Sequence, residues 1–156
     1  MSITADEMAQ KLTRVARGGV RSNIEEKKVV RLDPIVIMAL ADTDEIKMVR
    51  LSVRKGSNFK NALGSCLRHY NAYVYTFVKE GDGTEFPGAL LMANGNFDTL
   101  PSEDKYQVIT LQTGIKGTPS LLMSRAKVES NQGQRTLTEW TDVRLEEDSS
   151  FFPTDW

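Results

Sequence analysis

The hydrophobic pattern changes its period near Asn71, and this change restricts the chain to a mixed fold. Between Ser57 and Tyr70, apolar residues recur at the three- and four-residue steps of a single helix face. From Ala72 to Lys79, aromatic and smaller apolar residues alternate with the two-residue period of a strand. The pattern therefore predicts helices first and strands after them, which is an α+β fold.

The apolar stretch that begins after Pro34 has two interpretations. Asp33 and Pro34 form a good helix start, with Asp as the N-cap and Pro at the first helical position. Residues 35–41 would then be a short and almost wholly buried helix. The β-branched residues at 35–37 leave a buried strand as the alternative, because a short apolar run has no decisive period. The helix is the preferred interpretation.

A further helix is predicted from Asp42 to Gly56. Asp42 and Glu45 have the spacing of a capping box, and Gly56 is a typical residue just after a helix C-terminus. Together with the helix that begins after Ser57, this makes about three N-terminal helices. We expect them to pack on one face of the sheet.

The sheet is predicted to lie mainly in the C-terminal half. The segment 72–79 is apolar on both faces, so it is expected to be a central strand. A connection rich in Gly, Asp and Pro spans residues 80–104. Three β-rich segments follow, at 105–113, 120–128 and 135–145, with turn residues between them. They predict an antiparallel meander.

The chain is divided into one domain and two terminal segments. Residues 1–27 have a narrow apolar face interrupted by two glycines and are expected to be a flexible helix and linker. Residues 28–148 form the single α+β domain, and residues 149–156 form an aromatic tail. A chain of 156 residues that is 40% hydrophobic can bury an ordinary core.

Composition favours a cytoplasmic protein that does not enter a membrane. The single cysteine, Cys66, has no partner for an intramolecular disulfide. The longest apolar run, residues 35–41, is far shorter than the roughly 20 residues that span a bilayer. The N-terminus lacks the basic and apolar regions of a secretory signal.

Candidate catalytic residues are scarce, and none is assigned. Cys66 and His69 are one helical turn apart, but Cys66 lies on the apolar stripe, where burial keeps a thiol inert. One Cys and one His cannot supply a zinc site. No metal, cofactor or phosphate-binding loop is therefore expected. Asp98, Glu103 and Asp104 could serve a metal-dependent enzyme, which is the third-ranked function.

Charge is separated along the chain although the formal net charge is only −1. No acidic residue occurs from Ile46 to Val78, whereas acids are frequent on both sides of that segment. On the predicted helices the cations would form a positive stripe able to contact phosphates or an acidic partner. The candidate residues are Lys47, Arg50, Arg54, Lys55, Lys60 and Arg68.

The aromatic tail is the other candidate surface. Phe151, Phe152 and Trp156 follow an acidic run and resemble a short docking segment for a protein partner. Alternatively, they fold back over an open face of the sheet, which is the preferred interpretation. A function cannot be deduced from these features alone. They favour a small non-enzymatic interaction module that self-associates, ahead of a nucleic-acid-binding module that uses the basic stripe.

Overall fold

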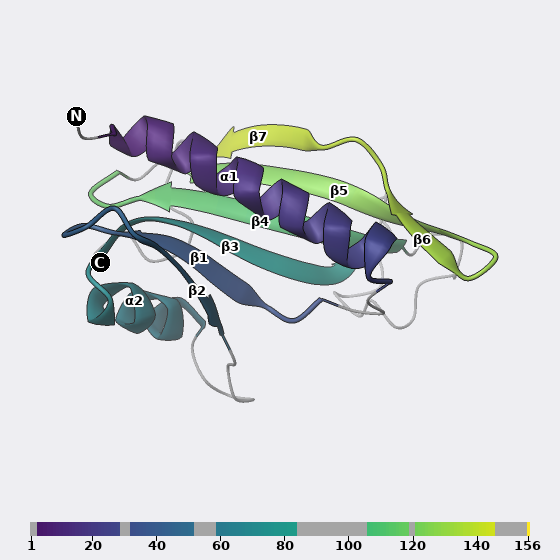
Figure 1. The fold of residues 1–156 in the computed structure, drawn as a ribbon, viewed down its shortest axis with the longest axis horizontal. Coiled ribbons are helices and arrows are strands. Elements are labelled where there is room, and N and C mark those ends of the chain that lie inside the picture. Colours follow the sequence, from purple (N-terminus) through teal and green to yellow (C-terminus); the bar gives the residue numbers. More distant parts are fainter. Residues whose placement is uncertain (1–2, 29–31, 52–58, 84–105, 119–120, 146–155) are drawn as a thin grey trace, which may run out of the picture.

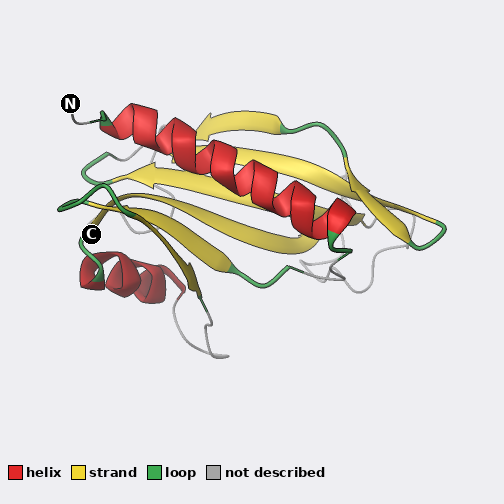
Figure 2. Ribbon diagram, in the orientation of Figure 1, coloured by secondary structure: helices red, strands yellow, loops and turns green. Residues whose placement is uncertain are grey.

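A seven-stranded antiparallel sheet lies between two helices in this computed structural model, which describes residues 3–28, 32–51, 59–83, 106–118, 121–145 and 156. Helix α1 (Ala5–Arg21) crosses one face of the sheet, and helix α2 (Phe59–His69) packs against the other (Figures 1 and 2). The strands are β1 (Ile35–Leu40), β2 (Ile46–Arg50), β3 (Ala72–Gly83), β4 (Tyr106–Ile115), β5 (Leu121–Asn131), β6 (Gln134–Leu137) and β7 (Thr141–Leu145).

The strand order is β2-β1-β3-β4-β5-β6, and every neighbouring pair is antiparallel. β3 lies in the interior of the sheet, so the predicted central strand at 72–79 is confirmed. The predicted meander is also present, but its last segment is divided. β6 pairs with β5 along residues 128–131, and β7 pairs with β5 along residues 121–125.

Helix α1 forms because its start and its buried face are both well specified. The Thr4 side chain caps the helix by accepting the backbone N–H of Glu7 at 3.1 Å. Residues at spacings of four then face the sheet, and a π-helical turn (Ser22–Glu26) continues this face to Ile24. The buried apolar residues are Met8, Ala9, Leu12, Ala16, Val20 and Ile24.

The expected loose attachment of the N-terminal segment is therefore wrong. Five of those side chains are at most 3% exposed, and burying each large one contributes about 1.5–3 kcal/mol. Gly18 and Gly19 interrupt the apolar pattern but lie within the helix, since burial on both sides of them outweighs their low helix propensity.

The segment predicted as a buried helix at 35–41 is instead strand β1. Ile35, Ile37 and Ala39 belong to the core between the sheet and α1. Val36 and Met38 belong to the core between the sheet and α2. A strand directs alternate side chains to opposite faces, so both faces of this apolar segment can be buried between two strands and two helices. The β-branched residues favour this conformation.

The predicted helix from Asp42 to Gly56 is also wrong over the described residues. Residues 41–43 form a turn, Asp44 has a φ of 58°, and Ile46–Arg50 is strand β2. Asp and Thr stabilise turns as well as helix starts, so the local signal was ambiguous. Pairing with β1 along its whole length decides in favour of the strand.

Helix α2 confirms the helix that is predicted by the apolar stripe between Ser57 and Tyr70. Leu63 and Leu67 are fully buried against Tyr75 and Phe77 of β3. This contact lies on the face opposite α1. The expectation of about three helices on one face is thus corrected to two described helices on opposite faces.

Three buried threonine hydroxyls connect α1 to the middle of the sheet. Thr113 of β4 lies 2.9 Å from the hydroxyl of Thr13 on α1 and 2.7 Å from that of Thr76 on β3. Thr13 also donates to the carbonyl of Ala9 at 2.8 Å. All three side chains are buried, so the hydroxyls of Thr76 and Thr113 have neighbouring threonine hydroxyls as partners in place of water.

A buried ion pair connects the other end of the sheet. The Glu80 carboxylate on β3 lies 2.7 Å from the Arg135 guanidinium on β6, and only 2% of its side chain is exposed. The same oxygen accepts the backbone N–H of Leu32 at 3.2 Å. This carboxylate therefore positions the chain just before β1 against the sheet.

Thr113→Val should lower the free energy of unfolding by about 1–3 kcal/mol, because the fully buried Thr76 hydroxyl loses its partner. Denaturation by urea, followed by circular dichroism, measures the change. Thr136→Val makes the same replacement at an exposed position on β6 and should change stability by less than about 0.5 kcal/mol. Equal effects in the two variants would contradict a role for the buried hydroxyls.

Candidate functional site

Strand β2 is an edge of the sheet: among the described strands, β1 is its one neighbour. Two hydrogen bonds at the ends of the β1–β2 ladder show which backbone N–H and C=O groups of β2 point toward β1. Leu51 donates its backbone N–H to Pro34 at 3.0 Å, and Leu40 donates to Glu45 at 2.9 Å. Both pairs continue the β1–β2 register and are therefore of the hydrogen-bonded kind.

Hydrogen-bonded pairs alternate with non-hydrogen-bonded pairs along an antiparallel ladder. Lys47 and Val49 consequently direct their backbone N–H and C=O groups toward β1. The corresponding groups of Ile46, Met48 and Arg50 point away from β1, to the edge at which no other described strand pairs. Three residues of β2 thus present donors and acceptors for another strand.

The same three residues have their side chains on the α1 face. Met48 is the register partner of Ile37, which belongs to the core beneath α1. Lys47 and Val49 have their side chains on the α2 face, where the Lys47 ammonium lies 4.8 Å from the centre of the Tyr70 ring. Each face of β2 therefore carries one cation.

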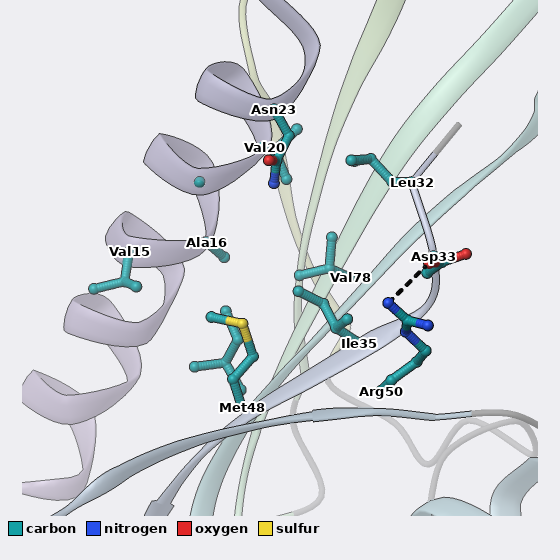
Figure 3. A pocket seen from close by; sticks show the side chains of 12 residues that line it. Val15, Ala16, Val20, Asn23, Leu32, Asp33, Ile35, Met48, Arg50 and Val78 are labelled. Carbon is teal, nitrogen blue, oxygen red and sulfur yellow. Dashed lines mark ion pairs between the residues drawn. The ribbon is translucent and has the colours of Figure 1, made fainter. Parts of the chain in front are cut away.

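An apolar groove of about 340 Å³ lies between α1 and strands β1, β2 and β3. Figure 3 shows Val15 and Met48 toward one side of this groove and the Asp33–Arg50 ion pair toward the other. Val15 is 43% exposed and Met48 is 60% exposed. These two residues are the large hydrophobic side chains that stand out as exposed within the described part of the chain.

The ion pair in the groove is weak. The Arg50 guanidinium lies 3.3 Å from the Asp33 carboxylate, but their side chains are 70% and 62% exposed. Water screens such a pair, and its contribution to stability is about 0–1 kcal/mol. The charges of both residues therefore remain accessible to a partner.

The predicted basic residues do not form one stripe. Lys47 and Arg50 were assigned to one face by helical spacing, but on a strand residues three apart point to opposite faces. Arg68 is on α2, exposed, and lies 3.4 Å from the Ser65 hydroxyl. Lys60 is also on α2, although its side chain is outside the described set, as are Arg54 and Lys55 altogether. Nucleic-acid binding stays an untested prediction.

Of the predicted aromatic tail, the structure describes one residue. Trp156 is buried, and its ring packs edge-on against Tyr75, with 5.3 Å between ring centroids. Gly114 makes room for that tyrosine, because a Cβ at this position would lie 2.6 Å from the Tyr75 ring. This contact matches the alternative in which the tail folds back over the sheet. Phe151 and Phe152 lie outside the described residues.

Cys66 and His69, the described candidates for nucleophilic chemistry, both lie on α2. Cys66 is half-buried, and burial raises the pKa of its thiol. His69 is exposed at the end of α2, with its ring edge-on to Tyr70 at 4.8 Å. Asp98, Glu103 and Asp104 are outside the described residues. Within those that are described, no three His, Cys, Asp or Glu side chains gather as metal ligands.

The helices of the described ranges are too short or too polar to cross a membrane.

No protein-family model, curated protein or solved structure matches this chain. The geometry of the β2 edge and of the adjacent groove is therefore the basis for any functional assignment.

One titratable contact orders the turn that leads into β2. The Tyr73 hydroxyl donates to the Asp44 carboxylate. Burial, then the hydrogen bond to Asp44 and the negative charge of Asp44, together raise the pKa of Tyr73 to about 12. The neutral phenol is thus favoured by folding. Its stabilising effect is complete below the ordinary tyrosine pKa of 10.0 and is lost as the pH rises through about 12.

Asp44→Asn should lower the pKa of Tyr73 toward 10.0, since it removes the charge while asparagine tolerates the positive φ at this position. Ultraviolet absorbance of the phenolate during a pH titration measures this pKa. Asp42→Asn is the matched control, because its carboxylate contacts Asn71 at 3.3 Å. The interpretation fails if both variants titrate like the wild-type protein.

Proposed function

We propose that the protein is a non-enzymatic interaction module that self-associates through the open edge of β2. The observation that carries the proposal is the outward direction of the backbone groups of Ile46, Met48 and Arg50. Unpaired strand edges bind further strands because each added strand satisfies these donors and acceptors.

A second copy fits this edge in an antiparallel, two-fold arrangement. The symmetry axis passes beside Met48, which lies opposite Met48 of the second copy. Ile46 of each copy then lies opposite Arg50 of the other. In this register each residue with outward backbone groups lies opposite another residue with outward backbone groups. Every one of these pairs is therefore of the hydrogen-bonded type. A two-fold interface of this kind closes and does not propagate into fibres.

Charge along β2 supports the same arrangement. The turn before the strand carries Asp42, Asp44 and Glu45, whereas the strand itself carries Lys47 and Arg50. Antiparallel pairing brings the acidic turn of one copy toward the Arg50 end of the other. Lys47 lies opposite Val49, so no like charges are directly opposed along the strand.

Side-chain exposure supports it as well. Met48 is 60% exposed on the α1 face, and pairing would place two such side chains together across the axis. An exposed edge strand with apolar side chains favours pairing with a further strand.

Met48→Pro should weaken self-association by about tenfold to a hundredfold. Proline has no N–H, so each copy loses one intermolecular hydrogen bond, worth together about 1–3 kcal/mol. The N–H of Met48 points away from β1, so the fold should tolerate the change. Sedimentation equilibrium over a range of protein concentrations measures the association constant, and circular dichroism verifies folding.

Met48→Thr is the matched control. Threonine keeps the backbone N–H and the preference for a strand but removes most of the apolar side chain. It should therefore weaken association less than proline does. A wild-type protein that stays monomeric at high micromolar concentration would overturn the proposal. A Met48→Pro variant that associates like wild type would show that β2 is not the interface.

A further inference from the structure

The groove between α1 and the sheet has the lining of a ligand site. Its volume of about 340 Å³ lies within the range of small-molecule pockets, roughly 300–1,000 Å³. Aliphatic side chains come from both sides, while the charged Arg50 and Asp33 lie together at one side (Figure 3). The principal aliphatic residues are Val15, Ala16, Val20, Ile35, Met48 and Val78.

The composition of the lining limits the ligand. The described residues that border the groove include no aromatic side chain, so they offer a planar ring no stacking partner. An aliphatic chain, in contrast, would contact methyl and methylene groups along the whole groove. The Arg50 guanidinium can bind a carboxylate through two parallel hydrogen bonds.

The helix wall of the groove includes a glycine that the fold itself does not require. Gly19 borders the groove, and a Cβ added there would meet nothing within 4 Å. Its φ is not in the left-handed region. Glycine weakens the interior of a helix, yet here it neither relieves a close contact nor permits a special backbone conformation. Because Gly19 borders the groove, a large side chain at this position would reduce the space at its helix wall.

The geometry points to this groove as a binding site for a small aliphatic carboxylate. The aliphatic chain lies between α1 and β1, toward Val15 and Met48, and the carboxylate binds Arg50 in place of Asp33. The Asp33 carboxylate is a replaceable partner, since its pair with Arg50 is well exposed to water. The aliphatic lining selects the hydrocarbon chain of this ligand, and the accessible Arg50 guanidinium selects its carboxylate.

Binding does not require the proposed self-association, because the described lining of the groove comes from a single copy. Binding is tested with octanoate as the probe and the full chain as the receptor, by isothermal titration calorimetry. We expect saturable binding with one octanoate per chain. 1-Octanol, which has the same chain without the charge, should bind at least tenfold more weakly.

Gly19→Leu and Gly18→Leu form a matched pair of variants. Both replace an exposed helix glycine with a better helix former, and neither added Cβ meets an atom within 4 Å. Gly19 borders the groove, whereas Gly18 is not among its lining residues. Gly19→Leu should therefore abolish octanoate binding while Gly18→Leu retains it. Because both changes favour the helix, loss of binding cannot be attributed to unfolding.

Arg50→Gln tests the head group. It should reduce octanoate affinity at least tenfold and leave 1-octanol affinity within about twofold. Failure of wild-type protein to bind octanoate would overturn the inference, as would retention of binding by Gly19→Leu. Equal binding of octanoate and 1-octanol would overturn the role of Arg50. A fall in sedimentation mass of ligand-free Gly19→Leu would assign the groove to a second copy instead.

Discussion

Burial of both faces of β1 and β3 is the constraint on which the rest of the structure depends. Alternate residues of these strands belong to two separate cores, so neither face can be left to water. Helix α1 covers one face, and α2 with Trp156 covers part of the other. The buried hydrogen bond between Thr13 and Thr113 then fixes α1 in one position on the sheet, because an alternative placement would break it. The groove exists because α1, held in this position, leaves part of its own surface and of β2 uncovered.

The sequence predicted the parts of the fold that have a long and regular period. The stripe that ends at Tyr70 is helix α2, and the alternation from 72 to 79 is a central strand. Prediction failed for residues 35–50, where the apolar runs are short and the Asp-rich segments suit turns as well as helix starts. It also missed the docking of α1. The spacing of four from Met8 through Leu12, Ala16 and Val20 to Ile24 was the available signal, but two glycines obscured it.

The candidate site was less predictable than the fold. Lys47 and Arg50 were chosen from the sequence, yet their assignment to one face depended on a helix that is a strand. That β2 ends the sheet is a consequence of strand order, which depends on contacts between distant segments and has no local pattern. Val15 could have been recognised as unburied, because it lies off the spacing-of-four face of α1. The exposure of Met48 follows from the edge position and could not be read from β2 alone.

The two faces of β2 differ in how strongly their side chains discourage pairing with another strand. This difference connects the two proposals. On the α2 face, Lys47 over the Tyr70 ring provides the kind of charge that usually discourages edge pairing. On the α1 face, Met48 is exposed and Arg50 has only a weak partner. Arg50 takes part in both proposals. It attracts the acidic turn of a second copy, and it binds the carboxylate of a ligand in the groove. A ligand that neutralises Arg50 would remove its attraction for that turn, and thermodynamic linkage then requires that self-association weaken ligand binding to the same extent.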